Sequence, residues 1–308
     1  MRFPVEVWPY LAAVLLVGVG AIVSSGFASP SHLLLILGLA SFLGLVAVGQ
    51  TLVILLGGID LSVSSTVTLA GVMSAAIAAG ANGRTLDAVA AALLAGVAIG
   101  LVNGLGVGML EIPPLVMTLG TTSVVQGLAL IYTNGAPKGS ASPLLSTVAT
   151  GSLAGVVPYT LLLWAVVAAL TIILLHRSVL GRWIYAVGHA PKAAYMSGVN
   201  VGLVQALAYT ISGFMAALAG VLLTGYTRTS YLTIGDPYQL GSIAAVVVGG
   251  TSILGGFGSY VGTIAGAVIV TIIQSLLPVL SIPEAGRQIV SGLIILVLLL
   301  LYGRERAS

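Results

Sequence analysis

The stretch that decides the fold is LLLILGLASFLGLVAVGQTLVILL at residues 33–56, followed directly by GGIDLS at residues 57–62. The longer stretch contains no charged residue. As a helix it is long enough to cross the roughly 30 Å of hydrocarbon in a bilayer. Inside lipid, a helix satisfies its own backbone hydrogen bonds. The stretch therefore predicts a transmembrane helix that ends at a pair of glycines.

The composition of the whole chain agrees with this prediction. The 308 residues are 58% hydrophobic and only 6% charged, and the mean hydropathy is +1.18, whereas ordinary globular chains are roughly 25% charged. So little charge excludes a soluble globule, a disordered chain, a coiled coil and a nucleic-acid-binding protein. Because the chain has no cysteine, disulfides, thiolate metal sites and thiol catalysis are excluded as well.

Apolar runs of spanning length recur to the end of the chain. We place ten of them, at residues 8–27, 33–56, 62–79, 86–109, 114–132, 157–175, 203–224, 240–254, 259–280 and 288–302. The eighth and tenth are short for a full crossing, so each is open to being a half-helix. The sequence predicts an all-α, polytopic membrane protein with about ten transmembrane helices, in a single domain of residues 1–308.

The distribution of basic residues predicts the orientation in the membrane. The loop at residues 176–202 carries Arg177, Arg182 and Lys192 but no acid, and the positive-inside rule places such a loop in the cytoplasm. Counting spans outward from this loop puts both termini in the cytoplasm. The loop at residues 134–156, rich in Gly, Ser, Pro and Thr, then lies on the exterior.

The second half of the chain echoes the first at a constant offset. Residues 56–58 and 254–256 both read LGG, and residues 47–48 and 245–246 both read AV. An internal duplication is common in transporters, whose two halves move against each other around a central site. In a chain with 41 glycines, short matches also arise by chance, and both explanations stay open.

One face of the fourth expected span is a ladder of glycines four residues apart: Gly96, Gly100, Gly104 and Gly108. A stripe without side chains lets another helix approach closely, and such packing holds helices together in lipid. The ladder predicts close helix packing, either within a tight bundle or at a dimer seam.

Asp60 is the carboxylate that most needs a role, because it lies between two apolar spans. It can cap the third span by accepting backbone N–H groups, or it can mark a helix break beside a polar cavity. The two roles are compatible. With Asp60, the amides Gln50, Asn103 and Gln126 inside the spans are the candidates for a translocation path, although amides also bridge helices to one another.

No set of residues supports catalysis. The three histidines lack metal-ligand spacing, and the glycine-rich residues 249–258 lack the Gly-Lys-Ser/Thr ending of a phosphate-binding loop. Intramembrane carboxylates of the kind that a proton relay uses are nearly absent. We therefore expect no catalytic residue, no metal and no cofactor, and any ATP must be hydrolysed by another chain.

The cytoplasmic loop contains a short helix signal. Within GHAPKAAYMSGVN at residues 188–200, Pro191 at a first helical position and Gly198 beyond the end bracket a helix of about seven residues. A helix that presents Ala193, Ala194 and Tyr195 suits insertion into a groove on another protein. A surface helix without a partner is the alternative.

Four segments of the chain resemble the permease subunits of ribose/xylose-type simple-sugar ABC importers, in the branched-chain amino acid/sugar permease superfamily. They are GGIDLSVSS at residues 57–65, YTNGAP at 132–137, LGRWIYAVGHAPKAAYMSGVNV at 180–201 and IAAVVVGGTSILGGFGSYVGT at 243–263. The segments run in order over nearly the whole chain, and the last two are specific in sequence rather than in composition. The resemblance implies a multi-pass permease of the bacterial inner membrane.

The resemblance also implies partners. These are an ABC ATPase with two nucleotide-binding domains, a periplasmic sugar-binding protein, and a second permease that is a copy of this chain or a sister chain. In such importers the loop before the seventh span contains the coupling helix that meets the ATPase. Here that role falls to Arg182, Pro191, Lys192, Ala193, Ala194, Tyr195, Ser197 and Gly198. The family segment before GGTS usually carries acids, whereas this chain has Gln239 and Gly241, which leaves the substrate open.

The function expected from the sequence is that of the transmembrane permease of an ATP-driven importer for a monosaccharide or similar small polar solute. The alternative is an ion-coupled secondary carrier or a channel that acts without an ATPase. The scarcity of charge inside the spans and the short helix in the cytoplasmic loop argue against this alternative.

Overall fold

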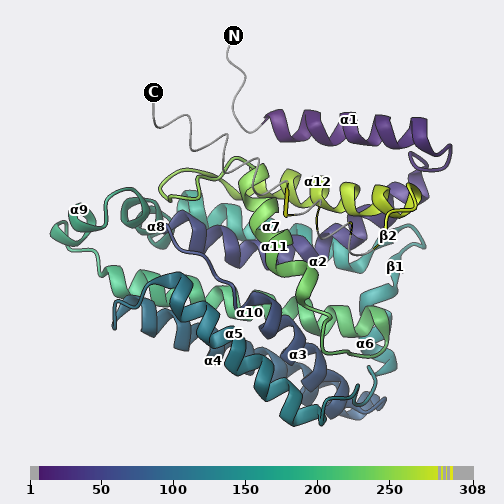
Figure 1. Ribbon diagram of the computed structural model, residues 1–308, viewed down its shortest axis with the longest axis horizontal. Coiled ribbons are helices and arrows are strands. Elements are labelled where there is room, and N and C mark those ends of the chain that lie inside the picture. The colour runs from purple at the N-terminus through teal and green to yellow at the C-terminus, as the bar shows by residue number, and fades with distance from the viewer. Residues whose placement is uncertain (1–6, 284–285, 287–288, 290–291, 294–308) are drawn as a thin grey trace.

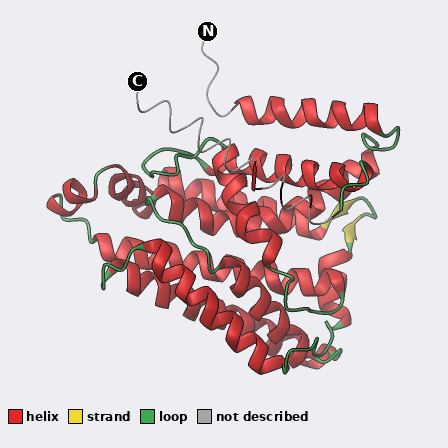
Figure 2. Cartoon of the chain, in the orientation of Figure 1, coloured by secondary structure: helices red, strands yellow, loops and turns green. Residues whose placement is uncertain are grey.

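The computed structural model describes residues 7–283, 286, 289 and 292–293, and this part of the chain is almost entirely helical (Figure 2). The elements follow the chain in the order α1 (Val7–Val23), α2 (Pro30–Leu55), α3 (Val63–Ala78), the 3-10 helix η1 (Asn82–Arg84), α4 (Thr85–Gly108), α5 (Pro114–Thr133), α6 (Pro143–Thr150), β1 (Ser152–Leu153), β2 (Val157–Pro158), α7 (Tyr159–Arg177), α8 (Val179–His189), α9 (Pro191–Met196), α10 (Val201–Thr227), α11 (Asp236–Val248) and α12 (Tyr260–Val279).

Most of the long helices run along the longest axis of the molecule (Figure 1). In this view α1 and α12 lie on one side and α4 and α5 on the other, with α2 and α10 between them. α10 packs on α2, α3 and α4, while α12 packs on α1, α2 and α11. α8 and α9 lie at one end of the molecule, and α6 and the antiparallel pair β1–β2 lie toward the opposite end.

Short polar side chains begin several of these helices. The side-chain oxygens of Ser29, Asn200 and Ser259 each accept a backbone N–H in the first turn of α2, α10 and α12, at 3.4, 3.0 and 3.2 Å. Such caps satisfy donors that have no partner within the helix. In these three cases local sequence sets where the apolar run becomes a helix.

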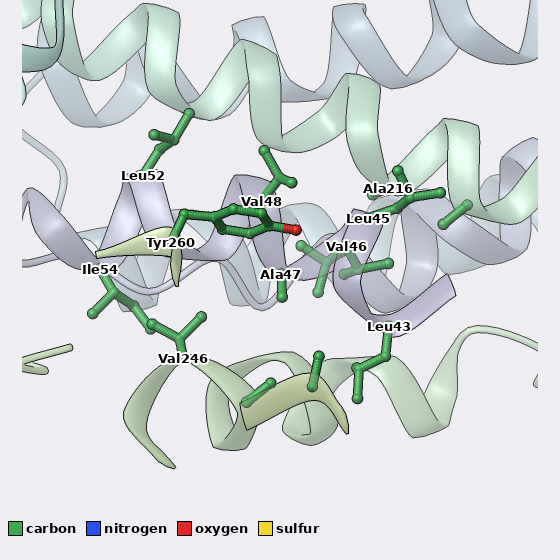
Figure 3. Close-up of a cluster of buried hydrophobic side chains, with 14 of the residues drawn as sticks. Leu43, Leu45, Val46, Ala47, Val48, Leu52, Ile54, Ala216, Val246 and Tyr260 are labelled. Carbon is green, nitrogen blue, oxygen red and sulfur yellow. The ribbon is translucent and has the colours of Figure 1, made fainter. Parts of the chain in front are cut away.

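The core is built around α2. From Ser41 to Leu55 every residue of this helix is buried, which is typical of a helix that is apolar all round and lies at the centre of a bundle. Tyr260 of α12 donates its hydroxyl to the carbonyl oxygen of Gly44 at 2.8 Å and accepts from Trp164 Nε1 of α7 at 2.8 Å. Its ring lies among Leu and Val side chains of α2 (Figure 3). Three helices are thus joined with no polar atom of the Tyr260–Trp164 pair left unpaired.

Six helical segments of the described chain are long and apolar enough to cross a membrane: α2, η1 with α4, α5, α7, α10 and α12. α1 and α3 are apolar but shorter, and the 13 residues of α11 extend about 20 Å. The tenth expected span, residues 288–302, lies almost wholly outside the described residues. The prediction of an all-α polytopic membrane protein is confirmed, whereas a count of ten goes beyond the described helices.

The eighth expected span is displaced along the chain. The sequence places it at residues 240–254, but α11 begins at Asp236 and ends at Val248, and residues 249–259 form a loop. Gly250 and Gly255 have φ of 88° and 87°, a conformation that glycine adopts without steric cost and that a right-handed helix does not use. These turns end the helix before the apolar sequence ends.

Candidate functional site

The glycine ladder of α4 faces α10. A Cβ added at Gly104 would lie 2.5 Å from Ala206 Cα, and one at Gly108 would lie 2.5 Å from a carbonyl oxygen of α10. At Gly96 and Gly100 an added Cβ would also meet the α10 backbone. The two helices therefore touch backbone to backbone, and this face packs within the chain rather than at a dimer seam.

Asp60 lies in the loop between α2 and α3 and is 1% exposed. Its Oδ1 accepts from the backbone N–H of Ser62 at 3.0 Å and from Ser62 Oγ at 2.6 Å. Its Oδ2 accepts from Ser212 Oγ of α10 at 2.7 Å. The carboxylate thus fixes the chain where α3 begins and also ties this loop to α10.

Asn103 of α4 extends these hydrogen bonds. Its Nδ2 donates to Ser62 Oγ at 2.8 Å, and its Oδ1 accepts from Thr121 Oγ1 of α5 at 2.6 Å. Because Ser62 Oγ donates to Asp60 and accepts from Asn103, a continuous chain of hydrogen bonds joins α10, the loop, α4 and α5. We call its members the polar network: Asp60, Ser62, Asn103, Thr121 and Ser212.

The other two candidates for a translocation path lie outside these hydrogen bonds. Gln50 of α2 is buried, and neither polar atom of its side chain has a hydrogen-bond partner among the described residues. Gln126 is exposed on α5, a helix that the rest of the chain covers only in part. The structure therefore joins Asp60 and Asn103 through Ser62 and leaves Gln50 and Gln126 outside the polar network.

Three residues of this region are not predicted from the sequence: Ser212, Thr121 and Tyr209. Tyr209 of α10 is 1% exposed, and its hydroxyl has no partner in the described part of the chain. It lies beside the loop, because a Cβ added at Gly58 would be 2.6 Å from the Tyr209 oxygen. A tyrosine inside an apolar run, such as Tyr209, is a sequence signal for a polar site. Ser212 and Thr121 give no such signal, because serine and threonine hydroxyls readily bond the backbone of their own helix.

The expected coupling segment forms two helices joined at Ala190. α8 leads into α9, and after α9 the chain turns at Gly198 with φ of 84°. The initial proline and the final glycine bracket a helix of six residues, one shorter than the sequence predicts. The sequence signals therefore place this helix correctly.

Most residues assigned to coupling are exposed at this end of the molecule: Arg182, Pro191, Lys192, Ala193, Tyr195, Ser197 and Gly198. Ala194 corrects the expectation, because it is 5% exposed and packs in the main core cluster instead of being presented. Met196 is 88% exposed. The sequence does not predict this exposure, because methionine is apolar.

A groove of about 1170 Å³ lies between α9 and the link from α4 to α5. Met109, Glu111 and Pro113 line it from the link, and Tyr195 and Met196 line it from α9. Large apolar side chains that stand exposed together are typical of a docking site. We call α9 and this groove the coupling surface. Among the described residues, no three His, Asp or Glu side chains gather to hold a metal ion.

Comparison with known proteins identifies relatives over most of the chain. It is 33% identical over 303 residues to the ribose import permease protein RbsC of Haemophilus influenzae, covering 97% of this chain and 93% of that protein. It is 35% identical over 304 residues to RbsC of Bacillus subtilis, covering 97% and 93%. It is 34% identical over 312 residues to the autoinducer 2 import system permease protein LsrC of Salmonella choleraesuis, covering 98% and 87%.

No solved structure matches the chain. Residues 32–299 match a family described as the permease component of the branched-chain amino acid transport system. The match begins near the start of α2. It includes the polar network, α8, α9 and the glycine-rich loops at residues 56–62 and 249–259. With this span matched, the chain belongs to the family of branched-chain amino acid transport system permease components.

Proposed function

We propose that this chain is the transmembrane permease subunit of an ABC importer that carries a monosaccharide or similar small polar solute across the bacterial inner membrane. A separate subunit hydrolyses ATP, because permeases of this kind are transport components rather than enzymes. The observation that carries the proposal is the coupling surface, a short exposed helix beside a groove at one end of a membrane bundle. The relatives named for ribose and autoinducer 2 import support the class of solute.

The coupling surface is the docking site of the ATPase, which brings two nucleotide-binding domains. Tyr195 is 72% exposed and Met196 is 88% exposed, so two large apolar side chains are available to a groove on a partner. Arg182 and Lys192 are exposed on α8 and α9 and suit acidic side chains on that partner. Movement of the ATPase against α9 is then passed to the membrane helices.

The end of the molecule that carries α8 and α9 also indicates how the bundle is oriented in the membrane. Residues 176–202, which contain α8 and α9, carry the basic excess that faces the cytoplasm. Tyr10 of α1 donates to the carbonyl oxygen of Val261 at 2.8 Å, which supports a start of α1 near this end and a cytoplasmic N-terminus. α6 and the β1–β2 pair lie toward the opposite end (Figure 1), where the periplasmic sugar-binding protein would dock.

The translocation path runs beside the polar network and α5. Asp60 and Asn103 are buried, so the path is closed in this conformation. α5 leaves Gln126 uncovered, and an amide facing hydrocarbon is unfavourable. A second permease, as a copy of this chain or a sister chain, would cover α5 and enclose the path between the two subunits.

Ten crossings and an internal repeat complete this architecture. α2 with α3, and α11 with α12, are each a pair of helices joined by a glycine-rich loop. The LGG sequences at residues 56–58 and 254–256 each lie in the loop shortly before the second helix of the pair. A repeat of this kind supplies two related halves that can move against each other.

Affinity purification of the tagged protein from its native membrane in mild detergent tests the proposal. We expect a stoichiometric ATPase to accompany it, and Tyr195→Asp to remove that ATPase without unfolding the chain, because the side chain is exposed. Tyr159→Asp, at an exposed tyrosine on α7, is the matched control and should keep the ATPase. Ala194 is unsuitable for this test because it is buried.

A second measurement separates the importer from an ion-coupled carrier. Uptake of ribose into cells should persist when the proton gradient is collapsed and ATP is maintained. Recovery of the chain alone after gentle cross-linking, together with uptake that stops when the gradient collapses, would contradict the proposal and favour a self-sufficient carrier or channel.

A further inference from the structure

Two glycine-rich loops meet at the end of the bundle that carries α8. Residues 56–62 join α2 to α3, and residues 249–259 join α11 to α12. The backbone N–H of Gly256 donates to the carbonyl oxygen of Leu55 at 2.9 Å, and a Cβ added at Gly255 would lie 2.7 Å from the Gly57 nitrogen. This contact, which we call the loop junction, is between backbone and backbone, so neither loop can shift here independently of the other.

Gly188 places α8 directly against the loop junction. A Cβ added there would strike the carbonyl oxygen of Leu55 and would lie 2.8 Å from the Gly256 nitrogen. One residue of α8 therefore touches both partners of the junction at once. Only glycine permits this approach, because any side chain would push α8 away from the two loops.

Two side chains of α8 contact the second loop. Tyr185 donates its hydroxyl to the carbonyl oxygen of Gly258 at 2.8 Å. The ring of His189 stands edge-on to that of Phe257, with 5.3 Å between the ring centroids and 80° between the ring planes. A displacement of α8 is therefore transmitted to residues 249–259 by a hydrogen bond and by an aromatic contact.

The two ends of this arrangement are the coupling surface and the polar network. α8 passes into α9 through the single residue Ala190, so α8 is the direct extension of the coupling surface into the bundle. At the other end, the loop at residues 56–62 contains Asp60, whose carboxylate is bonded to Ser212 of α10. The loop junction lies between these two regions, because α8 contacts it on one side and residues 56–62 lead from it to Asp60 on the other.

We infer that Tyr185, Gly188 and His189 form a relay that passes movement of the coupling surface to both glycine-rich loops, with Tyr185 as its positioning residue. The inference rests on the proposed function, since it requires an ATPase at the coupling surface. α8 carries residues 249–259 with it, the loop junction transfers the shift to residues 56–62, and the position of Asp60 changes in response.

Tyr185→Phe tests the relay because it removes one hydroxyl and keeps the ring. In proteoliposomes with the ATPase and the binding protein, solute uptake per ATP hydrolysed should fall about fivefold, the factor expected for one hydrogen bond of ordinary net strength. Assembly of the complex should be unchanged. Tyr159→Phe removes the same group on α7, away from α8, and should behave as the unsubstituted protein does.

Amide hydrogen exchange distinguishes a relay from a contact that only stabilises the fold. In the unsubstituted complex, ATP should alter the exchange of residues 249–259, and Tyr185→Phe should weaken this response while the ATPase stays bound. Equal uptake per ATP in the variant and the unsubstituted protein, or an unaltered ATP response of the loop, would overturn the relay. Failure of the proposed function is distinguishable, because the unsubstituted protein would then bind no ATPase.

Discussion

The loops at residues 56–62 and 249–259 both join two membrane helices through glycines, yet they are held in different ways. In the first loop the carboxylate of Asp60 accepts three hydrogen bonds, from Ser62 and Ser212. The second loop has no charged residue; the N–H of Ser252 donates to the carbonyl oxygen of Phe257 at 2.9 Å, and glycines with positive φ shape it. The two loops thus serve different tasks: the first attaches to α10 through a carboxylate, and the second contacts α8.

The largest effect is expected from Asp60→Ala, which removes the acceptor in the first loop. Three buried donor hydrogens lose their partner, and the expected loss of stability is about 3 kcal/mol. Thermal unfolding in detergent, followed by the amount of monodisperse protein, measures it. Asp87→Ala at an exposed position of α4 is the control. A midpoint for Asp60→Ala equal to that of the control would show that the first loop is held by something other than its carboxylate.

A smaller effect is expected from Gly256→Ala in the second loop. Gly256 has φ of 78°, and an added Cβ would lie 3.1 Å from His189 Cα. An alanine in the left-handed region is less stable by about 1–2 kcal/mol. The same unfolding measurement applies, with Gly26→Ala as the control because an added Cβ there meets nothing within 4 Å. If both variants unfold at one temperature, backbone conformation does not hold this loop.

The smallest effect is expected from Ser212→Ala, which removes one of the three donors to Asp60 and leaves the two hydrogen bonds from Ser62 in place. A single net hydrogen bond is worth about 1 kcal/mol, and the change should be non-additive with Asp60→Ala because the two residues share one contact. A double-mutant cycle in the same assay measures the coupling. Strict additivity would mean that the link to α10 contributes nothing and that Asp60 acts only through Ser62.

The features of this fold that can be predicted from the sequence are those with a local signal. The apolar runs predict most of the membrane helices, and the Pro-start and Gly-stop pattern predicts α9 to within a residue. It also marks Asp60 as a residue at a helix break. Each of these depends on neighbours within a few positions, which is the range over which helix periodicity and capping operate.

What the sequence does not supply is the partner of each feature. Ser212 lies 152 positions from Asp60, to which it donates a hydrogen bond. A single serine in a sequence does not indicate that its hydroxyl bonds a carboxylate. The burial of Ala194 depends on how α9 packs against the bundle, since alanine occurs on buried and on exposed faces of a helix alike. The glycine ladder likewise predicts close packing but names no helix, and α10 emerges as its partner only once the chain is folded.

The backbone contact between α4 and α10 has a consequence for biosynthesis. The last turn of α10 is made about 120 residues after α4 is complete, which at usual rates of translation is a delay of about 6–24 s. During this interval the glycine face of α4 has emerged without the helix that it fits. Correct assembly therefore depends on α4 being kept from other small-residue faces in the membrane until its own partner is inserted, which makes the order of insertion part of what specifies the fold.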